Sequence, residues 1–280
     1  MKLRFLIFGL LISLGSHAQW IYSYEDGVKL AKAEGKLLLL DFTASWCGPC
    51  KQMDANVWSD PEVKAFMDRM VMVKVDIDVE RSTAISYNVN AVPNIVVALP
   101  SGDVLKQEVG YQHSSFVINL LKSFPTDFKK IYQQQLVVNE NKNAVNFFKL
   151  GQEYANVASK SSKETKYHFI NRAEGAFKKA LKLSEQNGST DLPLRCKIRI
   201  ISLNIDRGKP QKALDQVLKE IKIDETSGEC VRSEFNVLCM RAYVGLKDKD
   251  KASEYLQYLE KSTEGLLLLE ECGEEILKLK

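Results

Sequence analysis

Two cysteines, Cys47 and Cys50, flank Gly48 and Pro49 and directly follow an apolar run. Two thiols at this spacing can form a short disulfide and exchange it with a disulfide of another molecule. If a helix begins at the first cysteine, unpaired backbone N–H groups and the helix dipole favour a thiolate there. The spacing therefore predicts Cys47 as a partly exposed nucleophile and Cys50 as a shielded resolving thiol, with Gly48 and Pro49 fixing the turn.

A zinc site is the main alternative use of a C-x-x-C pair, because structural zinc takes four nitrogen or sulfur ligands. The sequence has no second C-x-x-C, and its three histidines, His17, His113 and His168, are scattered. We therefore expect a redox-active cysteine pair, with no metal and no organic cofactor.

Hydrophobic periodicity predicts the elements that position this pair. Helical spacing of apolar residues between 25 and 36 predicts a helix that Gly35 ends, and a second helix is expected from the cysteine pair to about Trp58. Strands are predicted at 37–42, 71–76, 94–99 and 104–109, followed by a helix at 114–124. Continuous apolar strands alternating with helices favour an α/β fold with a mixed central sheet flanked by helices.

The segment 41–51, with the sequence DFTASWCGPCK, resembles the active-site strand and turn of the thioredoxin family. Residues 74–78 resemble the family's third strand, residues 87–93 resemble its cis-proline loop, and Gly110 matches its glycine near the site. The resemblance covers about 20–124. It implies a thioredoxin fold and a thiol:disulfide oxidoreductase, while Asn94, where the family usually has threonine, bears on substrate preference.

The resemblance also implies roles for the residues around the dithiol. Asp41 is expected to lie in a buried strand beneath Cys50, with a raised pKa, and to take the proton of Cys50; the alternative is a solvated acid at a strand end. Lys74 is expected to tune that pKa, or else to point outward. Trp46 is expected to form a wall of the thiol site and not to be plain core.

Substrate contact is expected at the loop opposite the dithiol. A cis bond between Val92 and Pro93 would present the Val92 backbone to an extended substrate, and Gly110 would lie near it. The alternative for Pro93 is a routine turn proline.

The N-terminus predicts export. Two cations, an apolar run from Phe5 to Leu14 and small residues up to Ala18 form the three parts of a secretory signal, so residues 1–18 are interpreted as a signal peptide. The run is too short for a membrane span, which needs about 20 apolar residues. We expect a periplasmic or secreted protein, and an exported reductant implies a membrane dithiol electron donor.

The composition is that of a soluble globular protein, with 27% charged and 45% hydrophobic residues in 280. Without the signal peptide, basic and acidic residues are almost balanced and no basic run remains to hold a phosphate backbone. The sequence therefore predicts no nucleic-acid partner.

The second half of the chain, residues 125–280, shows almost no strand pattern and predicts an all-α helix-hairpin array behind a thioredoxin-like domain at 19–124. Ala173, Ala213 and Ala252 recur at nearly equal spacing, which suggests degenerate tetratricopeptide-like (TPR-like) repeats; an irregular helical bundle is the alternative. Such an array is suited to protein–protein contact. The second functional hypothesis is accordingly a redox-sensing or scaffold module that recruits a protein partner.

The helical half contains four more cysteines, Cys196, Cys230, Cys239 and Cys272. A Cys230–Cys239 pair is disfavoured, because nine residues on one helix place the two on opposite faces. Buried free thiols are the simplest expectation, and disulfides among the four remain open. Taken together, the sequence favours an exported thiol:disulfide oxidoreductase that reduces disulfides of client proteins.

Overall fold

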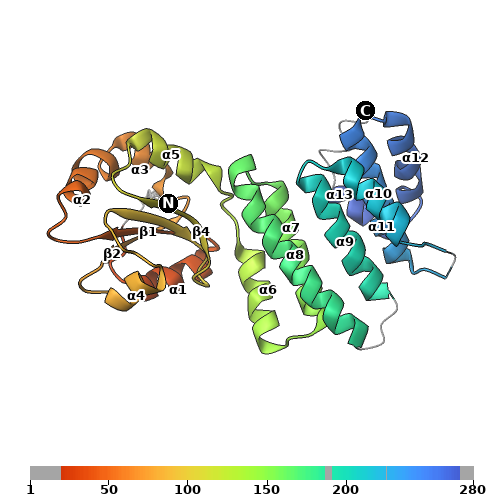
Figure 1. Ribbon diagram of the computed structural model, residues 1–280, viewed down its shortest axis with the longest axis horizontal. Helices are drawn as coiled ribbons and strands as arrows, with labels where there is room; N and C mark the ends of the chain where they lie inside the picture. Colours follow the sequence, from red (N-terminus) through yellow and green to blue (C-terminus); the bar gives the residue numbers. More distant parts are fainter. Residues whose placement is uncertain (1–19, 187–190, 225, 272–280) are drawn as a thin grey trace, which may run out of the picture. The chain divides into compact units, whose positions relative to one another are not determined.

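The computed structural model describes residues 20–186, 191–224 and 226–271 (Figure 1). The chain divides into two compact units, Met1–Lys122 and Ser123–Lys280. The expected signal peptide and Cys272 lie outside the described residues. Within the described ranges, every helix is too short or too polar to cross a membrane.

The first unit is built on one mixed sheet. Its strands are β1 (Leu38–Thr43), β2 (Val71–Asp76), β3 (Asn94–Ala98) and β4 (Val104–Val109), in the order β2-β1-β3-β4. β1 pairs with β2 in parallel, and the other two pairs are antiparallel. The four predicted strands are confirmed in order, with ends within one residue of those expected, whereas the helix α3 (Pro61–Met67) between β1 and β2 was not predicted.

Helices cover both faces of this sheet. α1 (Tyr24–Glu34) and α4 (Arg81–Ser86) lie on one face, and α2 (Gly48–Met53), α3 (Pro61–Met67) and α5 (Ser114–Ser123) lie on the other (Figure 1). As predicted, Gly35 ends α1 in the left-handed conformation, with φ 70°. The sheet is therefore buried on both sides, which explains its continuous apolar strands.

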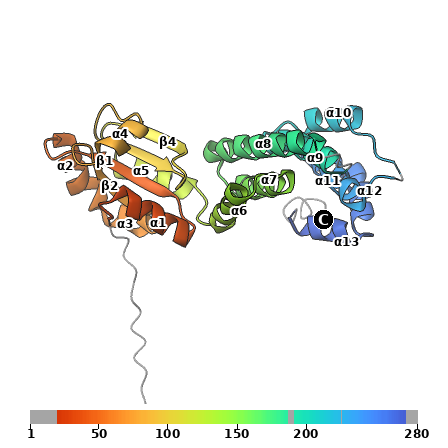
Figure 2. The ribbon, with the colours of Figure 1, turned by 90° about the horizontal axis from the view of Figure 1, so that it is seen from below.

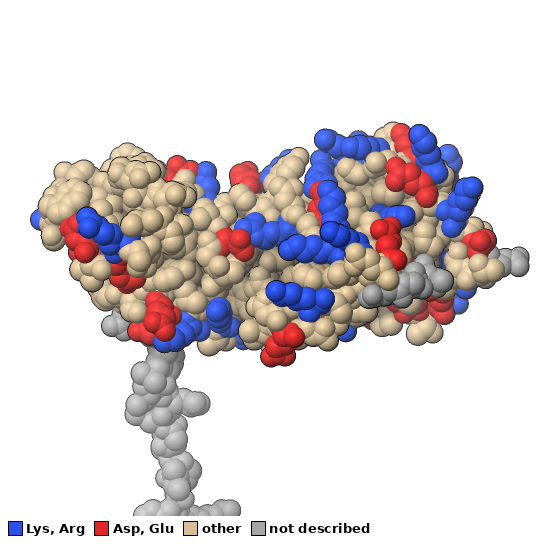
Figure 3. Space-filling view, turned by 60° about the horizontal axis from the view of Figure 1, so that its bottom comes forward, with Lys and Arg blue, Asp and Glu red and all other residues tan. Residues whose placement is uncertain are grey.

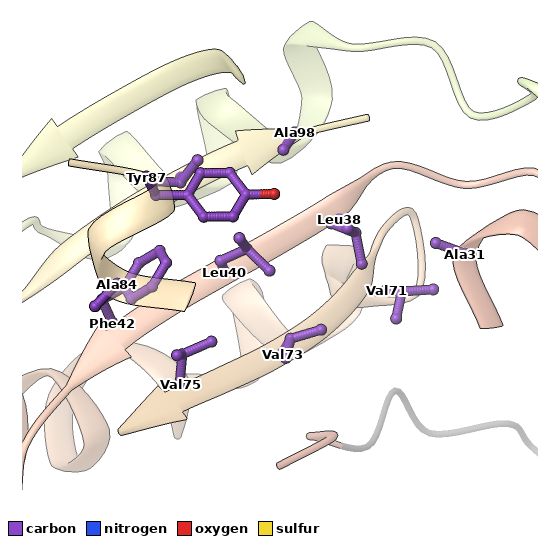
Figure 4. Packing of buried hydrophobic residues seen from close by; sticks show 11 residues of the cluster. Ala31, Leu38, Leu40, Phe42, Val71, Val73, Val75, Ala84, Tyr87 and Ala98 are labelled. Atoms are coloured by element: carbon purple, nitrogen blue, oxygen red, sulfur yellow. The ribbon is translucent and has the colours of Figure 1, made fainter. Parts of the chain in front are cut away.

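Alternation along the strands separates core residues from site residues. Leu38, Leu40 and Phe42 of β1 pack toward α1 and α4, together with alternate residues of β2 and β3 (Figure 4). Because successive side chains in a strand point to opposite faces, Asp41 points to the other face, under α2. The same alternation puts Lys74 on that face, directly beside Asp41 in the parallel register.

One predicted helix differs from the observed one. The helix expected from the cysteine pair to Trp58 is α2 followed by a π-helical turn, η1 (Asp54–Trp58). A π turn rotates the following residues relative to an α-helix and is frequent at functional sites. Asp54 and Trp58 are the first and last residues of this turn.

In its described residues, the second unit contains helices joined by loops and no strand. Its helices are α6 (Lys129–Glu140), α7 (Ala144–Ser159), α8 (Lys163–Gln186), α9 (Asp191–Asp206), α10 (Pro210–Glu220), α11 (Glu229–Leu246), α12 (Lys249–Leu259) and α13 (Thr263–Glu271). α7 packs with α8, α9 with α10, and α11 with α12, as three successive hairpins (Figures 1 and 2). The expected helix-hairpin array is confirmed.

The spaced alanines occupy equivalent places in these hairpins. Ala173, Ala213 and Ala252 lie on α8, α10 and α12, the second helix of each pair, and all three are completely buried. A small residue at this point lets the two helices of a hairpin approach closely. The equivalence supports the repeat interpretation over an irregular bundle.

Candidate active site

The cysteine pair lies where β1 is followed by α2. Cys47 is the N-cap residue of α2, and its sulfur accepts a hydrogen bond from the backbone N–H of Cys50 at 3.1 Å. The two cysteines form a disulfide, and their Cα atoms are 5.3 Å apart. In the reduced protein the same N–H group and the helix dipole would stabilise a Cys47 thiolate.

The two cysteine residues are equally buried. Cys47 and Cys50 are each 3% exposed, and they pack with Ala44 against Ile77 and Val92. The expectation of a partly exposed Cys47 is therefore wrong for the oxidised structure. Neighbouring loops that carry Ile77 and Val92 cover the helix start, and their positions depend on the tertiary fold.

Gly48 and Pro49 open α2. Pro49 lies in the first helical turn, where its missing N–H leaves no hydrogen bond unmade. A side chain at Gly48 would meet no atom within 4 Å of its Cβ, and the backbone of Gly48 is not in the left-handed conformation. Of the two residues expected to fix the turn, only Pro49 restricts the backbone.

A second loop lies against the dithiol. The Val92–Pro93 peptide bond is cis, as predicted. Val92 packs on the cysteine pair, and the Pro93 carbonyl accepts a hydrogen bond from the N–H of Gly110 at 2.7 Å. Gly110 has φ +92°, which a residue with a side chain rarely adopts. The structure thus brings Val92, Pro93 and Gly110 together beside the dithiol.

Asn94 follows the cis-proline and is almost completely buried. Its side-chain oxygen has no hydrogen-bond partner in the described part of the chain. Threonine, which the thioredoxin family usually has here, carries no such carbonyl group. The structure thus places a buried amide oxygen directly after the cis-proline.

Trp46 is not core: it is 66% exposed. Its ring N–H donates a hydrogen bond to the Asp78 carboxylate at 2.8 Å, which fixes the ring immediately before the dithiol. The exposed position fits the prediction that Trp46 forms a wall of the thiol site, and not the alternative that it belongs to the core.

Asp41 is 3% exposed, so it is not a solvated acid. Burial raises its pKa from 3.8 to about 6; the nearby Lys74 lowers the pKa, and the Asp54 carboxylate raises it. The Lys74 ammonium lies 3.5 Å from the Asp41 carboxylate, and its side chain is 13% exposed. An acid with a pKa near 6 can accept and release a proton at neutral pH.

Three residues near Asp41 were not identified from the sequence. Asp54 forms a second ion pair with Lys74. The buried ring N–H of Trp58 has no hydrogen bond of good geometry, although it approaches the Asp41 carboxyl closely enough to lower its pKa. Trp20 lies over Lys74, with 4.8 Å between the ammonium and the ring centroid. For Asp54, the sequence did contain a signal: it follows Cys50 by four residues on the expected helix, and residues at this spacing lie on the same helix face.

Three cysteines lie in the described residues of the helical unit. Cys196, Cys230 and Cys239 are free thiols; Cys196 and Cys239 are buried, and Cys230 is half-buried. Burial raises the pKa of both Cys196 and Cys239 to about 12, so neither is activated. Among the residues with described positions, no group of three or more His, Cys, Asp or Glu could hold a metal ion.

Comparisons with known proteins agree with this geometry. Residues 19–100 match a family described as thioredoxin-like. Thioredoxin-T of Drosophila melanogaster is 39% identical over 82 residues, which are 29% of this chain and 50% of that protein. The TPR repeat-containing thioredoxin TDX of Arabidopsis thaliana is 37% identical over 102 residues, 32% of this chain and 26% of that protein. The chain therefore spans half of the first relative and about a quarter of the second.

A third relative is matched over most of its length. Thioredoxin H4 of Arabidopsis thaliana is 33% identical over 109 residues, which are 39% of this chain and 87% of that protein. With identity of this level across nearly a whole thioredoxin, the chain belongs to the thioredoxin family of thiol:disulfide oxidoreductases.

Proposed function

We propose that this protein is an exported disulfide reductase that transfers two electrons from Cys47 and Cys50 to disulfides of client proteins. The observation that carries the proposal is the buried Asp41, whose pKa of about 6 suits a base that works near neutral pH. Export rests on the signal-like residues 1–18.

The proposed reaction has two steps. The Cys47 thiolate attacks one sulfur of the client disulfide; that S–S bond breaks, a mixed disulfide forms, and the released client thiolate takes a proton from water. Asp41 then removes the proton of Cys50, and the Cys50 thiolate attacks the Cys47 sulfur. The second client thiolate leaves and is protonated, so the client gains two electrons and the Cys47–Cys50 disulfide is restored.

The direction of electron flow follows from the sequence between the cysteines. Gly48 and Pro49, together with Asp41, resemble thioredoxin, whose potential of about −270 mV makes it a reductant, whereas exported oxidants lie near −120 mV. An exported reductant must be re-reduced in its compartment. A membrane dithiol protein is therefore the proposed electron donor.

Insulin reduction by the full mature chain tests this function. We expect turnover in the wild-type protein and none in Cys47→Ser, because the nucleophile is lost. Cys196→Ser is the matched control, since it removes a buried thiol with a raised pKa in the other unit of the chain, and it should keep full turnover. Turnover in Cys47→Ser would rule out the assignment.

The helical unit is proposed to recruit clients. A groove of about 340 Å³ lies between α8, α9 and α10. Its lining includes the cations Lys197, Arg207 and Lys212, the acids Glu174 and Glu220, and the apolar Leu181 and Ile200; Arg207 is paired with Glu174 within this lining. Lysine and arginine side chains are prominent on the helical unit (Figure 3). An extended client segment that carries apolar residues and an acidic group for Lys197 or Lys212 would complement this lining.

Trapping of mixed disulfides tests recruitment. Cys50→Ser removes the resolving thiol, so clients accumulate on Cys47. Adding Lys197→Glu and Lys212→Glu should reduce or change the trapped set, because a docked client reacts at a raised effective concentration. Lys129→Glu with Lys130→Glu, on α6 and outside the groove, is the control. Identical sets from all three proteins would show that the groove does not select clients.

The alternative is a redox-sensing or scaffold module, which the helix-hairpin array favours. It predicts partner binding that depends on the Cys47–Cys50 disulfide, without multiple turnovers on insulin. The insulin assay separates the two hypotheses.

A further inference from the structure

The surroundings of Lys74 are unusual for a lysine. Its ammonium contacts the carboxylates of Asp41 and Asp54, and it lies 4.8 Å from the centroid of the Trp20 ring. A cation within about 6 Å of an aromatic centroid is attracted to the ring face, more strongly where water is excluded. Three partners thus hold one ammonium group whose side chain is largely buried.

Trp20 is fixed in this place by the backbone and by a second ring. The N–H of Ile21 donates to the carbonyl of Met72 at 3.0 Å, and the N–H of Lys74 donates to the carbonyl of Ile21 at 2.8 Å. The Trp20 ring also meets Trp58 edge to face, with centroids 5.1 Å apart. The strand that carries Lys74 therefore also positions the ring above it.

The two carboxylates compete for Lys74. Asp41 is buried, whereas the side chain of Asp54 is half-exposed and can draw the ammonium toward solvent. A flexible lysine chain has several rotamers, and each would give Asp41 a different electrostatic environment. A ring that restricts the ammonium to one position fixes its distance from Asp41.

We propose that Trp20 is a positioning residue of the redox site: its ring holds the Lys74 ammonium between Asp41 and Asp54 and so sets how readily Asp41 accepts the proton of Cys50. The inference rests on the proposed function for the role of Asp41. It makes the segment directly after the expected signal-peptide cleavage site, at Ala18, a working part of the active site.

The charged groups that act on Asp41 are Lys74 from β2 and Asp54 from η1, and the ring N–H of Trp58 from η1 also lowers its pKa. In the proposed function, the reduced Cys50 on α2 is the proton donor. Lys74 lowers the pKa of Asp41. A less restrained Lys74 stabilises the Asp41 carboxylate less, so loss of the Trp20 ring should raise this pKa. Trp20→Leu tests this directly, since leucine keeps apolar contact with Trp58 but cannot attract a cation.

The experiment is a carbon-13 NMR titration of the Asp41 carboxyl group in the full mature protein. Trp20→Leu should raise its pKa by about 0.5 to 1, the size expected for a cation–π contact. Trp20→Phe, which keeps an aromatic face, should give a smaller rise. Tyr22→Leu is the matched control, because Tyr22 is an exposed aromatic residue in the same segment, and it should give no change.

A double-mutant cycle decides the mechanism. In a Lys74→Met background, Trp20→Leu should no longer shift the pKa of Asp41, because the held group is absent. An unchanged pKa in Trp20→Leu alone, a lowered one, or the same shift with and without Lys74 would overturn the proposal. The titration needs no client, so failure of insulin reduction would count against the proposed function and not against this inference.

Discussion

Among the residues that the structure describes, each unit of the chain buries one carboxylate, and the two are compensated differently. Asp41 of the thioredoxin-like unit is 3% exposed and shares a single cation, Lys74, with a second acid, Asp54. Its negative charge is therefore poorly compensated inside the protein. Burial then raises its pKa to about 6, where it can exchange protons.

Glu234 of the helical unit is also 3% exposed, but two guanidinium groups meet it. Arg195 and Arg199 of α9 donate to the same oxygen of Glu234, at 2.9 Å and at 3.1 to 3.2 Å. Since Glu234 lies on α11, this cluster ties two helices of the array together. In this protein, the acid proposed to exchange protons thus has one cation beside it, whereas the acid that joins two helices has two.

Asp41→Asn should have the largest effect on activity. Loss of the base should slow insulin reduction at pH 7 by about 10²-fold, within the usual range for general base catalysis. Turnover of the wild-type protein should itself decline as the pH falls through about 6, because Asp41 becomes protonated. Equal rates of the two proteins between pH 6 and 9 would show that Asp41 is only structural.

Asp41→Asn should have the opposite effect on stability: it should lower activity at neutral pH but not lower the free energy of unfolding there. The pKa of Asp41 is raised on folding, so the native state binds this proton more tightly than the unfolded state does. Its contribution to the free energy of unfolding is therefore greatest at low pH and is lost as the pH rises from about 4 to about 6, by at most about 3 kcal/mol. The free energy of unfolding, measured with denaturant at pH values of about 4 and about 6, should show this loss in the wild type and not in Asp41→Asn.

Glu234→Gln should affect stability and leave the chemistry unchanged. Removing one member of a buried ion cluster leaves Arg195 and Arg199 uncompensated, and costs about 3 to 5 kcal/mol in comparable cases. Urea unfolding of the helical unit measures this loss of stability. Glu254→Gln, at an exposed position, is the control. A loss of insulin turnover in a folded Glu234→Gln protein would break the division of roles between the two acids.

Lys74→Met and Asp54→Asn should shift the pKa of Asp41 in opposite directions. Lys74 lowers the pKa of Asp41, so Lys74→Met raises it; Asp54 raises the pKa, so Asp54→Asn lowers it. The acid limb of the pH profile of insulin reduction should shift accordingly, by about one pH unit. Shifts in the same direction would show that Lys74 and Asp54 do not act on the pKa of Asp41 with opposite signs.

The smallest effects are expected at two glycines beside the dithiol. Gly48 lies in a helix start with open space, so Gly48→Ala should change the free energy of unfolding by less than about 0.5 kcal/mol. Gly110 has φ +92°, so Gly110→Ala should cost about 1 to 2 kcal/mol. Equal costs in thermal unfolding would contradict the backbone requirement at Gly110.

The sequence predicts what local patterns encode. Apolar runs located the strands, Gly35 marked a helix end, and the C-x-x-C spacing with Pro93 located the two loops that meet at the dithiol. These features depend on neighbouring residues or on a motif, so one sequence is enough to identify them.

Features that depend on the tertiary fold were not predictable. The π turn moves Asp54 and Trp58 to new positions, and Trp20 reaches Lys74 only because its segment pairs with β2. The burial of Cys47 likewise comes from loops distant in sequence. Sequence periodicity describes one element at a time and does not show which residues of different elements meet.

The central claim, that the protein is a reductase, is tested most directly by the redox potential of the Cys47–Cys50 pair. The full mature protein is equilibrated with mixtures of oxidised and reduced dithiothreitol, and the fraction of disulfide is measured by thiol alkylation and mass spectrometry. For a reductase we expect a potential of about −270 mV, similar to thioredoxin. A value of about −120 mV would identify an oxidant and contradict the claim.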